Sequence, residues 1–387
     1  MNQARGKVVV GLSGGVDSAV AAWLLQQQGY DVQAVFMKNW SEDDFGGPCP
    51  WAEDQASAEA VARHLNIPLV TWNFEPEYRQ RVFQVMLHEY EQGRTPNPDI
   101  LCNREIKFDL FLKKALELAP LIATGHYART NNGKLYKAID DDKDQSYFLA
   151  AVSSEALKHT LFPLGDLKKI NVRTIAKDAG LPNWDRPDSV GICFVGEKNM
   201  VKFLSKYITW NPGPITLSSG EKVGQHRGLQ FYTIGQRHGF GVDLDQKKMS
   251  KLMKPGQPVF VSEKRTADNA LIIAPADKPE ALEMKEFVVT EPHWIYPSPQ
   301  KVTGARPWKT ETGIPTKEGS PVFPWTGTAK LRYRQPDVPV TLVPEGQNIR
   351  VICQTPQRAV TPGQYAVFYQ GDECLGSAVI DNVDNLG

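Results

Sequence analysis

Residues 7–30, KVVVGLSGGVDSAVAAWLLQQQGY, contain the pattern that predicts the fold class of the first half of the chain. A β-rich run, KVVVGL, is followed by the glycine-rich string SGGVDS at 13–18 and then by an apolar helical pattern that begins near Ala19. The runs VQAVFM, EDQASAEAVARHL and PLVTWNF continue this alternation of strand and helix patterns over 32–74. Such an alternation predicts a mostly parallel sheet covered by helices on both faces. A ligand is then expected at the carboxyl ends of the strands.

Three zones follow from the change of pattern along the chain. Residues 1–204 form the predicted α/β domain, with further helices expected over 77–92 and 100–118. In 284–387 the helical periodicity disappears, and prolines separate short β-rich runs such as VPVTLV and QYAVFYQ. This pattern predicts an antiparallel sandwich or small barrel, and of the two we expect the β-barrel. Residues 205–283 carry glycine-rich turns and mixed patterns, so we expect a small mixed connecting domain there.

Composition narrows the class of protein. The 387 residues fit two or three domains, and 44 Lys and Arg balance 44 Asp and Glu, so a uniformly basic coat for nucleic acid is excluded. There is no apolar run of about 18 residues and no basic N-terminal region followed by a long apolar stretch, so we expect a cytoplasmic protein without a membrane partner. The five cysteines lack CxxC spacing, which argues against a disulfide scaffold and a zinc site.

The string SGGVDS has the composition of a phosphate-binding loop. Its adjacent glycines let the backbone approach a phosphate, the amides of the following helix face it, and Ser13 and Ser18 add hydroxyl donors. The plainer interpretation is a glycine turn whose helix is capped by Asp17 or Ser18. No lysine follows, so this is not a Walker loop. It resembles instead the PP-loop of ATP pyrophosphatases, which split ATP between the α and β phosphates and adenylate a substrate.

Two cysteines lie in distinctive segments. RTPNPDILCNREIKF puts Cys102 in the first turn of a helix for which Asp99 is the expected N-cap, and such a position favours a thiolate. DSVGICFVGE puts Cys193 between Gly191 and Gly196 in a short strand-like run. Taken singly, each cysteine is equally compatible with a packing residue in a helix or a buried strand.

Seven strings, in this order, are similar to the tRNA-specific 2-thiouridylase family over residues 6–380. The strings are GLSGGVDSAVAAWLLQQQGYDVQAVFMKNW, GRTPNPDILCNREIKFDLFL, IATGHYAR, DSVGICFVGE, FYTIGQRHGFG, AKLRYRQP and AVTPGQYAVFY. The resemblance implies a PP-loop domain and thiolation of the wobble uridine at C2 in tRNAs for Lys, Glu and Gln. It also implies ATP, with magnesium expected on its phosphates, and sulfur delivered as a protein persulfide by a sulfur carrier or cysteine desulfurase.

The same resemblance assigns roles to residues of the α/β domain. Cys193 is similar to the residue that carries the persulfide, Cys102 to the nucleophile that breaks its S–S bond, and the two are expected to end as a disulfide. Asp99 is similar to the acid/base residue, and Asn97, Pro98 and Asp99 to residues beside the target base. The positions that resemble ATP contacts are Gly11, Leu12, Ser13, Gly14, Gly15, Val16, Asp17, Ser18, Met37 and Gly125.

The anticodon arm of tRNA is the expected partner of the barrel and central domain. Arg332, Tyr333 and Arg334 are predicted to alternate along a strand, so that the two arginines share a face and Tyr333 points the other way, although an exposed charged edge strand would look the same. Further positions that resemble tRNA contacts are His126, Lys143, Asp144, Gln145 and Gln364.

Some features depart from this picture or leave alternatives open. Residues 303–325 look long and irregular for the family, and Val190 stands where a polar residue is more usual. Cys49, Cys353 and Cys374 are expected to be structural or incidental. An ATP pyrophosphatase that forms a C–N bond would need neither Cys102 nor Cys193. A non-catalytic RNA-binding protein with a relic loop is a third possibility, which the intact SGGVDS disfavours.

Overall fold

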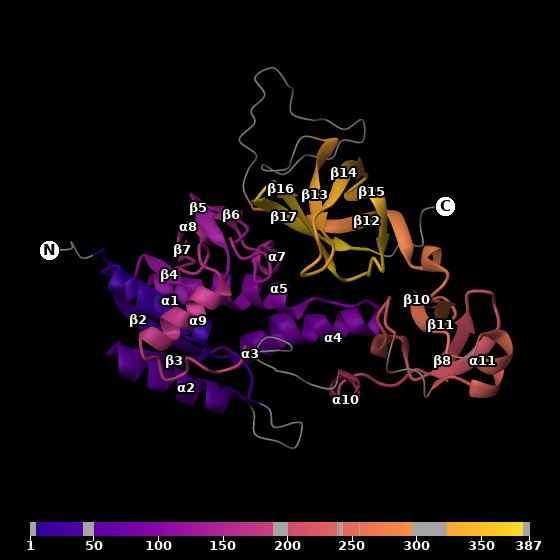
Figure 1. The fold of residues 1–387 in the computed structure, drawn as a ribbon, viewed down its shortest axis with the longest axis horizontal. Helices are drawn as coiled ribbons and strands as arrows, with labels where there is room; N and C mark the ends of the chain where they lie inside the picture. The colour runs from indigo at the N-terminus through magenta and orange to yellow at the C-terminus, as the bar shows by residue number, and fades with distance from the viewer. Residues whose placement is uncertain are drawn as a thin grey trace.

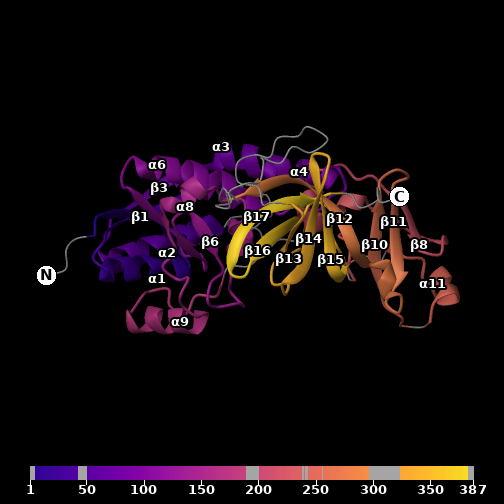
Figure 2. The ribbon, with the colours of Figure 1, turned by 90° about the horizontal axis from the view of Figure 1, so that it is seen from above.

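A computed structural model of the chain has three regions that follow one another along its length (Figure 1). It describes residues 5–41, 50–188, 200–237, 239, 243–254, 256–295 and 323–381. The first region is an α/β domain, the second is a small sheet, and the third is a β-barrel. Seen from above, the barrel lies between the other two regions (Figure 2).

The α/β domain is built on a five-stranded sheet in which every pairing is parallel, in the order β3-β2-β1-β4-β7. Successive side chains of β1 enter different cores: Val8 and Val10 join one buried cluster and Val9 joins the other. Both faces of the sheet are therefore covered by helices, as the β-branched runs predict. The strands are β1 (Lys7–Gly11), β2 (Asp31–Lys38), β3 (Leu69–Asn73), β4 (Leu121–Ala123) and β7 (Thr160–Leu161).

The helices of this domain divide between the two faces. The helices packed with Val8 and Val10 are α1 (Val16–Gln27), α2 (Pro50–Leu65) and α9 (Lys169–Asp178). Those that contribute to the other core are α3 (Glu75–Tyr78), α4 (Gln84–Glu91), α5 (Pro98–Cys102), α6 (Leu112–Leu116), α7 (Ser146–Leu149) and α8 (Ser154–Lys158). The helices expected over 77–92 and 100–118 are present, but each contains a π-helical stretch, Arg79–Phe83 and Asn103–Phe111.

The central region is rich in β structure. Its four-stranded sheet has the order β10-β11-β8-β9, in which only the β11–β8 pair is parallel. The strands are β8 (Gly213–Leu217), β9 (Lys222–His226), β10 (Val259–Arg265) and β11 (Ala270–Pro275). The helical segments around them are α10 (Met200–Leu204), α11 (Gln246–Leu252) and the 3-10 turns Leu229–Phe231 and Pro279–Ala281.

The predicted antiparallel barrel is confirmed. Its strands pair in the order β12-β15-β14-β13-β16-β17, and a β12–β17 pairing closes the ring. Closure removes the exposed strand edges that an open sheet would present. The strands are β12 (Glu283–Trp294), β13 (Trp325–Lys330), β14 (Val338–Glu345), β15 (Asn348–Arg358), β16 (Tyr365–Gln370) and β17 (Glu373–Ile380).

The barrel is joined to the α/β domain by strand pairing. The hairpin of β5 (Arg129–Asn131) and β6 (Lys134–Tyr136) adds to the barrel sheet through β6 and β17, where Cys374 is opposite Leu135. The two regions therefore share a continuous hydrogen-bonded ladder. No helix of the described ranges is both long and apolar enough to cross a membrane.

Candidate active site

The phosphate loop lies where β1 passes into α1. Helix α1 begins at Val16, three residues before the expected start, and its N-cap is Gly15, which makes no side-chain capping hydrogen bond. The interpretation as a turn capped by Asp17 or Ser18 is therefore wrong. Ser18 Oγ instead accepts from Ser13 N at 3.1 Å and donates to Gly15 O at 3.0 Å. This arrangement suits an anion at the start of the helix.

Three side chains from distant segments hold the Gly14 carbonyl. Ser57 Oγ donates to it at 2.7 Å, Asn183 Nδ2 at 2.8 Å and Arg186 Nη1 at 3.1 Å. Gly14 has a φ of +84°, and a Cβ added there would lie 2.2 Å from Asp54 O, so only glycine fits. None of these three residues is among the predicted contacts, because nothing local in the sequence marks them as neighbours of the loop.

Three further expected ATP contacts, Gly11, Met37 and Gly125, lie at the same edge of the sheet. A Cβ added at Gly125, just after β4, would lie 2.6 Å from Ser18 N, so this glycine permits close contact with the loop. One added at Gly11, the last residue of β1, would lie 3.1 Å from the Met37 side chain at the end of β2. The expected ATP contacts thus gather at the carboxyl ends of three parallel strands.

A network of charges surrounds the first turn of α1. Asp17 accepts from Lys169 Nζ at 2.7 Å and from the Tyr127 hydroxyl at 2.8 Å. Lys169 also reaches Asp188 at 2.9 Å, and Lys143 Nζ lies 2.7 Å from the same carboxylate. Burial by itself would raise the pKa of Asp188, but the hydrogen bonds from Lys143 and Lys169 hold that pKa well below its usual range. Lys143, an expected tRNA contact, is thus engaged beside the phosphate loop.

Helix α5 carries Asp99 and Cys102, but its start differs from the expectation. The N-cap is Asn97, whose Oδ1 accepts from Ile100 N at 3.3 Å, and Pro98 occupies the first turn. Asp99 is a half-buried residue of the first turn and not the cap. Proline has no N–H to be capped, which explains why the helix begins one residue after Asn97.

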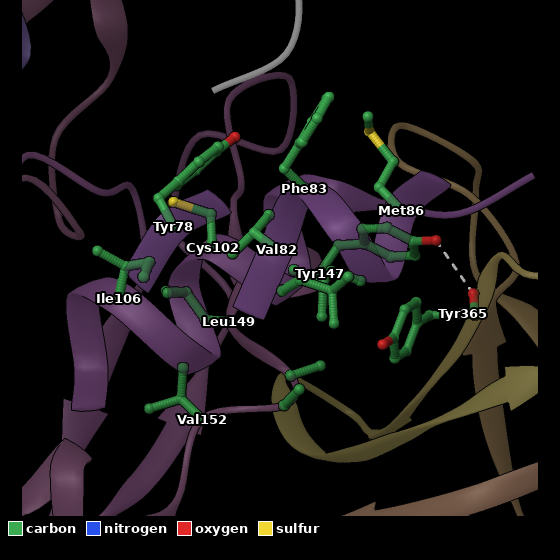
Figure 3. Packing of buried hydrophobic residues seen from close by; sticks show 14 of the residues in the cluster. Tyr78, Val82, Phe83, Met86, Cys102, Ile106, Tyr147, Leu149, Val152 and Tyr365 are labelled. Atoms are coloured by element: carbon green, nitrogen blue, oxygen red, sulfur yellow. Dashed lines mark hydrogen bonds between the residues drawn. The ribbon is translucent and has the colours of Figure 1, made fainter. Parts of the chain in front are cut away.

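Cys102 is the fifth residue of α5 and not part of its first turn. It is 0% exposed and belongs to the apolar cluster that contains Tyr78, Val82 and Leu149 (Figure 3). Its surroundings are therefore those of a core residue and not those of an exposed helix start. For Cys102 to act on a substrate, this cluster has to open or rearrange.

The other cysteines fall into two groups. Cys353 and Cys374 are buried in the barrel, and burial raises the pKa of Cys353 to about 11 and raises that of Cys374 further. Both fit the expected packing role. Cys49, Val190, Gly191, Cys193 and Gly196 lie outside the described residues, as does most of 303–325.

Two of the expected tRNA contacts, Asp144 and Gln145, accept hydrogen bonds from within the protein. Asp144 is 3% exposed, and its carboxylate accepts from Ala138 N, Ser146 N and Ser146 Oγ. The burial and these three donors give the Asp144 carboxylate a structural role, and a tRNA contact at this position stays a prediction. The Gln145 side chain accepts from Tyr127 N at 3.0 Å.

His126 lies directly after Gly125, next to the loop. Its Nδ1 is 2.8 Å from Thr124 Oγ1, and its ring packs edge-on against Phe162. Burial, assisted by the nearby Lys107, lowers its pKa well below the usual value. These surroundings therefore disfavour the charged imidazolium form of His126.

The segment Arg332 to Arg334 is a turn and not a strand. Strand β13 ends at Lys330, and Arg334 has a φ of +62°, so the expected alternation along a strand is wrong. The backbone turns here because Leu331 N donates to the Gln335 side chain. Both arginines are exposed, and the Arg334 guanidinium lies 5.3 Å from the centre of the Tyr333 ring. The centre of that ring is 4.4 Å from the centre of the Phe148 ring.

Comparison with known proteins supplies the family. Residues 6–197 match the tRNA methyl transferase HUP domain, 201–275 the tRNA methyl transferase PRC-barrel domain and 284–380 the aminomethyltransferase beta-barrel domain. The tRNA-specific 2-thiouridylase MnmA of Legionella pneumophila (strain Paris) is 45% identical over 385 residues, which cover 98% of this chain and 99% of that protein. The chain belongs to the tRNA-specific 2-thiouridylase family.

Other relatives give the same assignment for this family member. The tRNA-specific 2-thiouridylase MnmA of Bacillus cytotoxicus is 44% identical over 387 residues, covering 98% of this chain and 96% of that protein. Among solved structures, NMN synthetase from Francisella tularensis has 19% identity and a TM-score of 0.32, and covers 47% of this chain and 66% of that one. The MnmA relatives match all three regions, which leaves a C–N ligase or a relic RNA-binding protein without support.

Proposed function

We propose that this family member thiolates C2 of the wobble uridine in tRNAs for Lys, Glu and Gln, using ATP and a protein persulfide. The observation that carries the proposal is the uncapped start of α1 at the carboxyl edge of the parallel sheet, together with Met37 and Gly125. We propose the cytoplasm as its location and 1–204, 205–283 and 284–387 as its domains.

Adenylation is the first step of this mechanism. The uracil O2 attacks the α phosphate of ATP, the bond between the α and β phosphates breaks, and pyrophosphate leaves. O2 then departs as part of AMP when sulfur adds to C2. Asp99, half-buried on α5, is suited to exchange the proton of the base. Magnesium would neutralise phosphate charge, and Mg²⁺ commonly takes one or two carboxylates together with phosphates. Asp17 is a carboxylate at the loop, but it accepts from Lys169 and Tyr127, so it would have to exchange these partners to hold the ion.

Sulfur transfer requires both cysteines. A carrier or desulfurase loads Cys193 as the persulfide, and its sulfane sulfur adds to C2 as AMP leaves. The Cys102 thiolate then attacks Cys193 Sγ, which breaks the bond from Cys193 Sγ to the sulfane sulfur and forms the Cys102–Cys193 disulfide. The sulfane sulfur is reduced to the thiocarbonyl level, and the two cysteine sulfurs are oxidised to a disulfide. A cellular thiol reductant must then reduce this disulfide to restore the two cysteines. The burial of Cys102 means that the step follows a rearrangement of its cluster.

The test is a turnover reaction with purified tRNA, ATP and a persulfide donor, followed by nucleotide chromatography, thionucleoside analysis and non-reducing peptide mass spectrometry. We expect AMP, pyrophosphate, 2-thiouridine and a linked Cys102–Cys193 peptide pair. Cys193→Ser should abolish sulfur loading, and Cys102→Ser should load sulfur but deliver it poorly. Cys353→Ala, in the barrel core, is the matched control. ADP and phosphate as the coupled products, or normal thiolation by Cys102→Ser, would contradict the mechanism.

A further inference from the structure

The barrel holds the segment that leads into α5. Thr95 N donates to Pro362 O at 2.8 Å, which joins the two chain segments through their backbones. Gln364 Nε2 donates to Thr95 O at 2.8 Å and to Pro96 O at 3.3 Å. The approach is so close that a Cβ at Gly363 would lie 2.9 Å from Thr95 N.

Arg94 makes a second connection from the same segment. Its Nη1 donates to Asp381 Oδ1 at 2.9 Å and its Nη2 to Ile380 O at 3.2 Å, both just at or after the end of β17. Its Nε lies 2.8 Å from Glu89 Oε2 on α4. The Arg94 side chain is 17% exposed, so solvent screens these charged hydrogen bonds only in part.

The residue that follows this segment is Asn97, the N-cap of α5. Its side chain accepts from Ile100 N and also hydrogen-bonds Tyr147. The Tyr147 hydroxyl donates to Tyr365 O at 3.0 Å, the contact drawn as a dashed line in Figure 3. Asn97 is thus fixed to the barrel on two sides, through the 94–96 segment before it and through Tyr147 beside it.

Gln364 uses its amide inside the protein. The amide nitrogen donates to two adjacent carbonyl oxygens of the 95–96 segment, so this side chain is engaged by the protein backbone. We infer that Gln364 and Arg94 are positioning residues: they hold the start of α5 against the barrel, so that a tRNA bound by the barrel finds Asn97–Asp99 at a fixed place. The inference rests on the proposed function.

The first experiment separates positioning from tRNA binding. Single-turnover thiolation at saturating tRNA and ATP is measured beside tRNA affinity for Gln364→Ala and for Gln364→Glu, whose carboxylate would face the two carbonyls. We expect the thiolation rate to fall at least about tenfold, more for Gln364→Glu, because a shift of about 1 Å at the reacting groups can cost about a hundredfold. The tRNA dissociation constant should change less than about twofold. Gln370→Ala, at an exposed glutamine of the same barrel, should change neither quantity.

The second experiment tests the Arg94 connection. Arg94→Met should lower the same rate without weakening tRNA binding, and Arg94→Lys should restore part of it, since an ammonium can reach one acceptor but not hold two as the guanidinium does. Thermal unfolding checks that each variant folds. If Arg94→Met does not fold, the rates and affinities of the Gln364 variants test the inference.

The outcomes of these experiments are distinct. A weaker tRNA affinity with an unchanged single-turnover rate for Gln364→Ala would overturn the inference and make this residue a tRNA contact. An unchanged rate and an unchanged affinity would overturn it as well. If the wild-type chain itself does not thiolate tRNA, the proposed function is contradicted instead. The wild-type measurement comes first, so the two failures can be told apart.

Discussion

Gly125 is the residue at which the PP-loop leaves no room for a side chain. An added Cβ would meet Ser18 N at 2.6 Å and Asp17 C at 2.7 Å, which are backbone atoms of the loop. Gly125→Ala should therefore displace the loop and weaken ATP binding about tenfold or more, since overpacking typically costs about 1–3 kcal/mol. Isothermal titration with ATP measures this. Gly371→Ala, where an added Cβ meets nothing within 4 Å, should bind ATP normally. Equal affinity of the two variants would show that the loop tolerates the shift.

His126 gives a prediction for the pH dependence of stability. Burial and Lys107 lower its pKa in the folded protein, whereas the unfolded chain has a pKa of about 6.5. Below about pH 6.5 the unfolded state therefore binds more protons than the folded state. The free energy of unfolding falls as the pH is lowered through this range, by up to about 1.4 kcal/mol per pH unit. Burial also lowers the pKa of His226, so protonation of His226 destabilises the folded protein on acidification as well.

The check is the unfolding midpoint between pH 7.5 and 5.5. His126→Asn should lose less stability on acidification than the wild type, while His88→Asn, at an exposed position on α4, should follow the wild type. If the unfolding midpoints of all three proteins fall equally with pH, the folded protein does not disfavour protonation of His126.

At the scale of elements, the segment between β6 and α7 depends on one buried carboxylate. Asp144 accepts from Ala138 N, Ser146 N and Ser146 Oγ, and Lys330 Nζ of the barrel lies 3.4 Å away. This segment therefore folds around Asp144 and contacts the barrel through it.

Asp144→Ala should destabilise the protein by about 3 kcal/mol, because it leaves buried donors and the Lys330 ammonium without this acceptor. Lys143→Ala, next to it on a half-buried ion pair, should cost about 1 kcal/mol or less. Urea unfolding monitored by fluorescence compares the two. A stable Asp144→Ala variant with weakened tRNA binding would instead support the tRNA contact predicted for this residue.

At the scale of the whole molecule, the tRNA surface is expected to include the turn after β13. Arg332 and Arg334 are exposed there, beside Tyr333 and Phe148, which brings barrel and α/β domain together. Replacing both arginines by alanine should weaken tRNA binding and lower the salt slope by up to about 0.9 for each duplex phosphate that the variant no longer neutralises, or about 0.7 for single strands. ATP binding should be unchanged. If the double variant binds tRNA as the wild type does across a salt series, the turn is not part of the tRNA surface.

The strand–loop–helix at 7–30, the parallel sheet and the antiparallel barrel could all be predicted from local sequence patterns. These features depend on patterns a few residues long: β-branched runs, adjacent glycines and the period of apolar positions. The same local reasoning was wrong at Arg332–Arg334, where a charged run that follows β13 resembles a continuation of the strand. There the Leu331 N–H bonds a side chain four residues on and the backbone turns.

Only the tertiary structure decided what surrounds the site. Ser57, Asn183 and Arg186 converge on Gly14, Cys102 is enclosed by a core, and Gln364 binds a segment 268 residues earlier in the chain. Hydrogen bonds of this kind form between residues that are far apart in the sequence and are brought together when the elements pack. No local period or motif in the sequence predicts them. The sequence therefore predicts which groups carry the chemistry, and packing determines which of them are exposed, which are buried and what holds them in place.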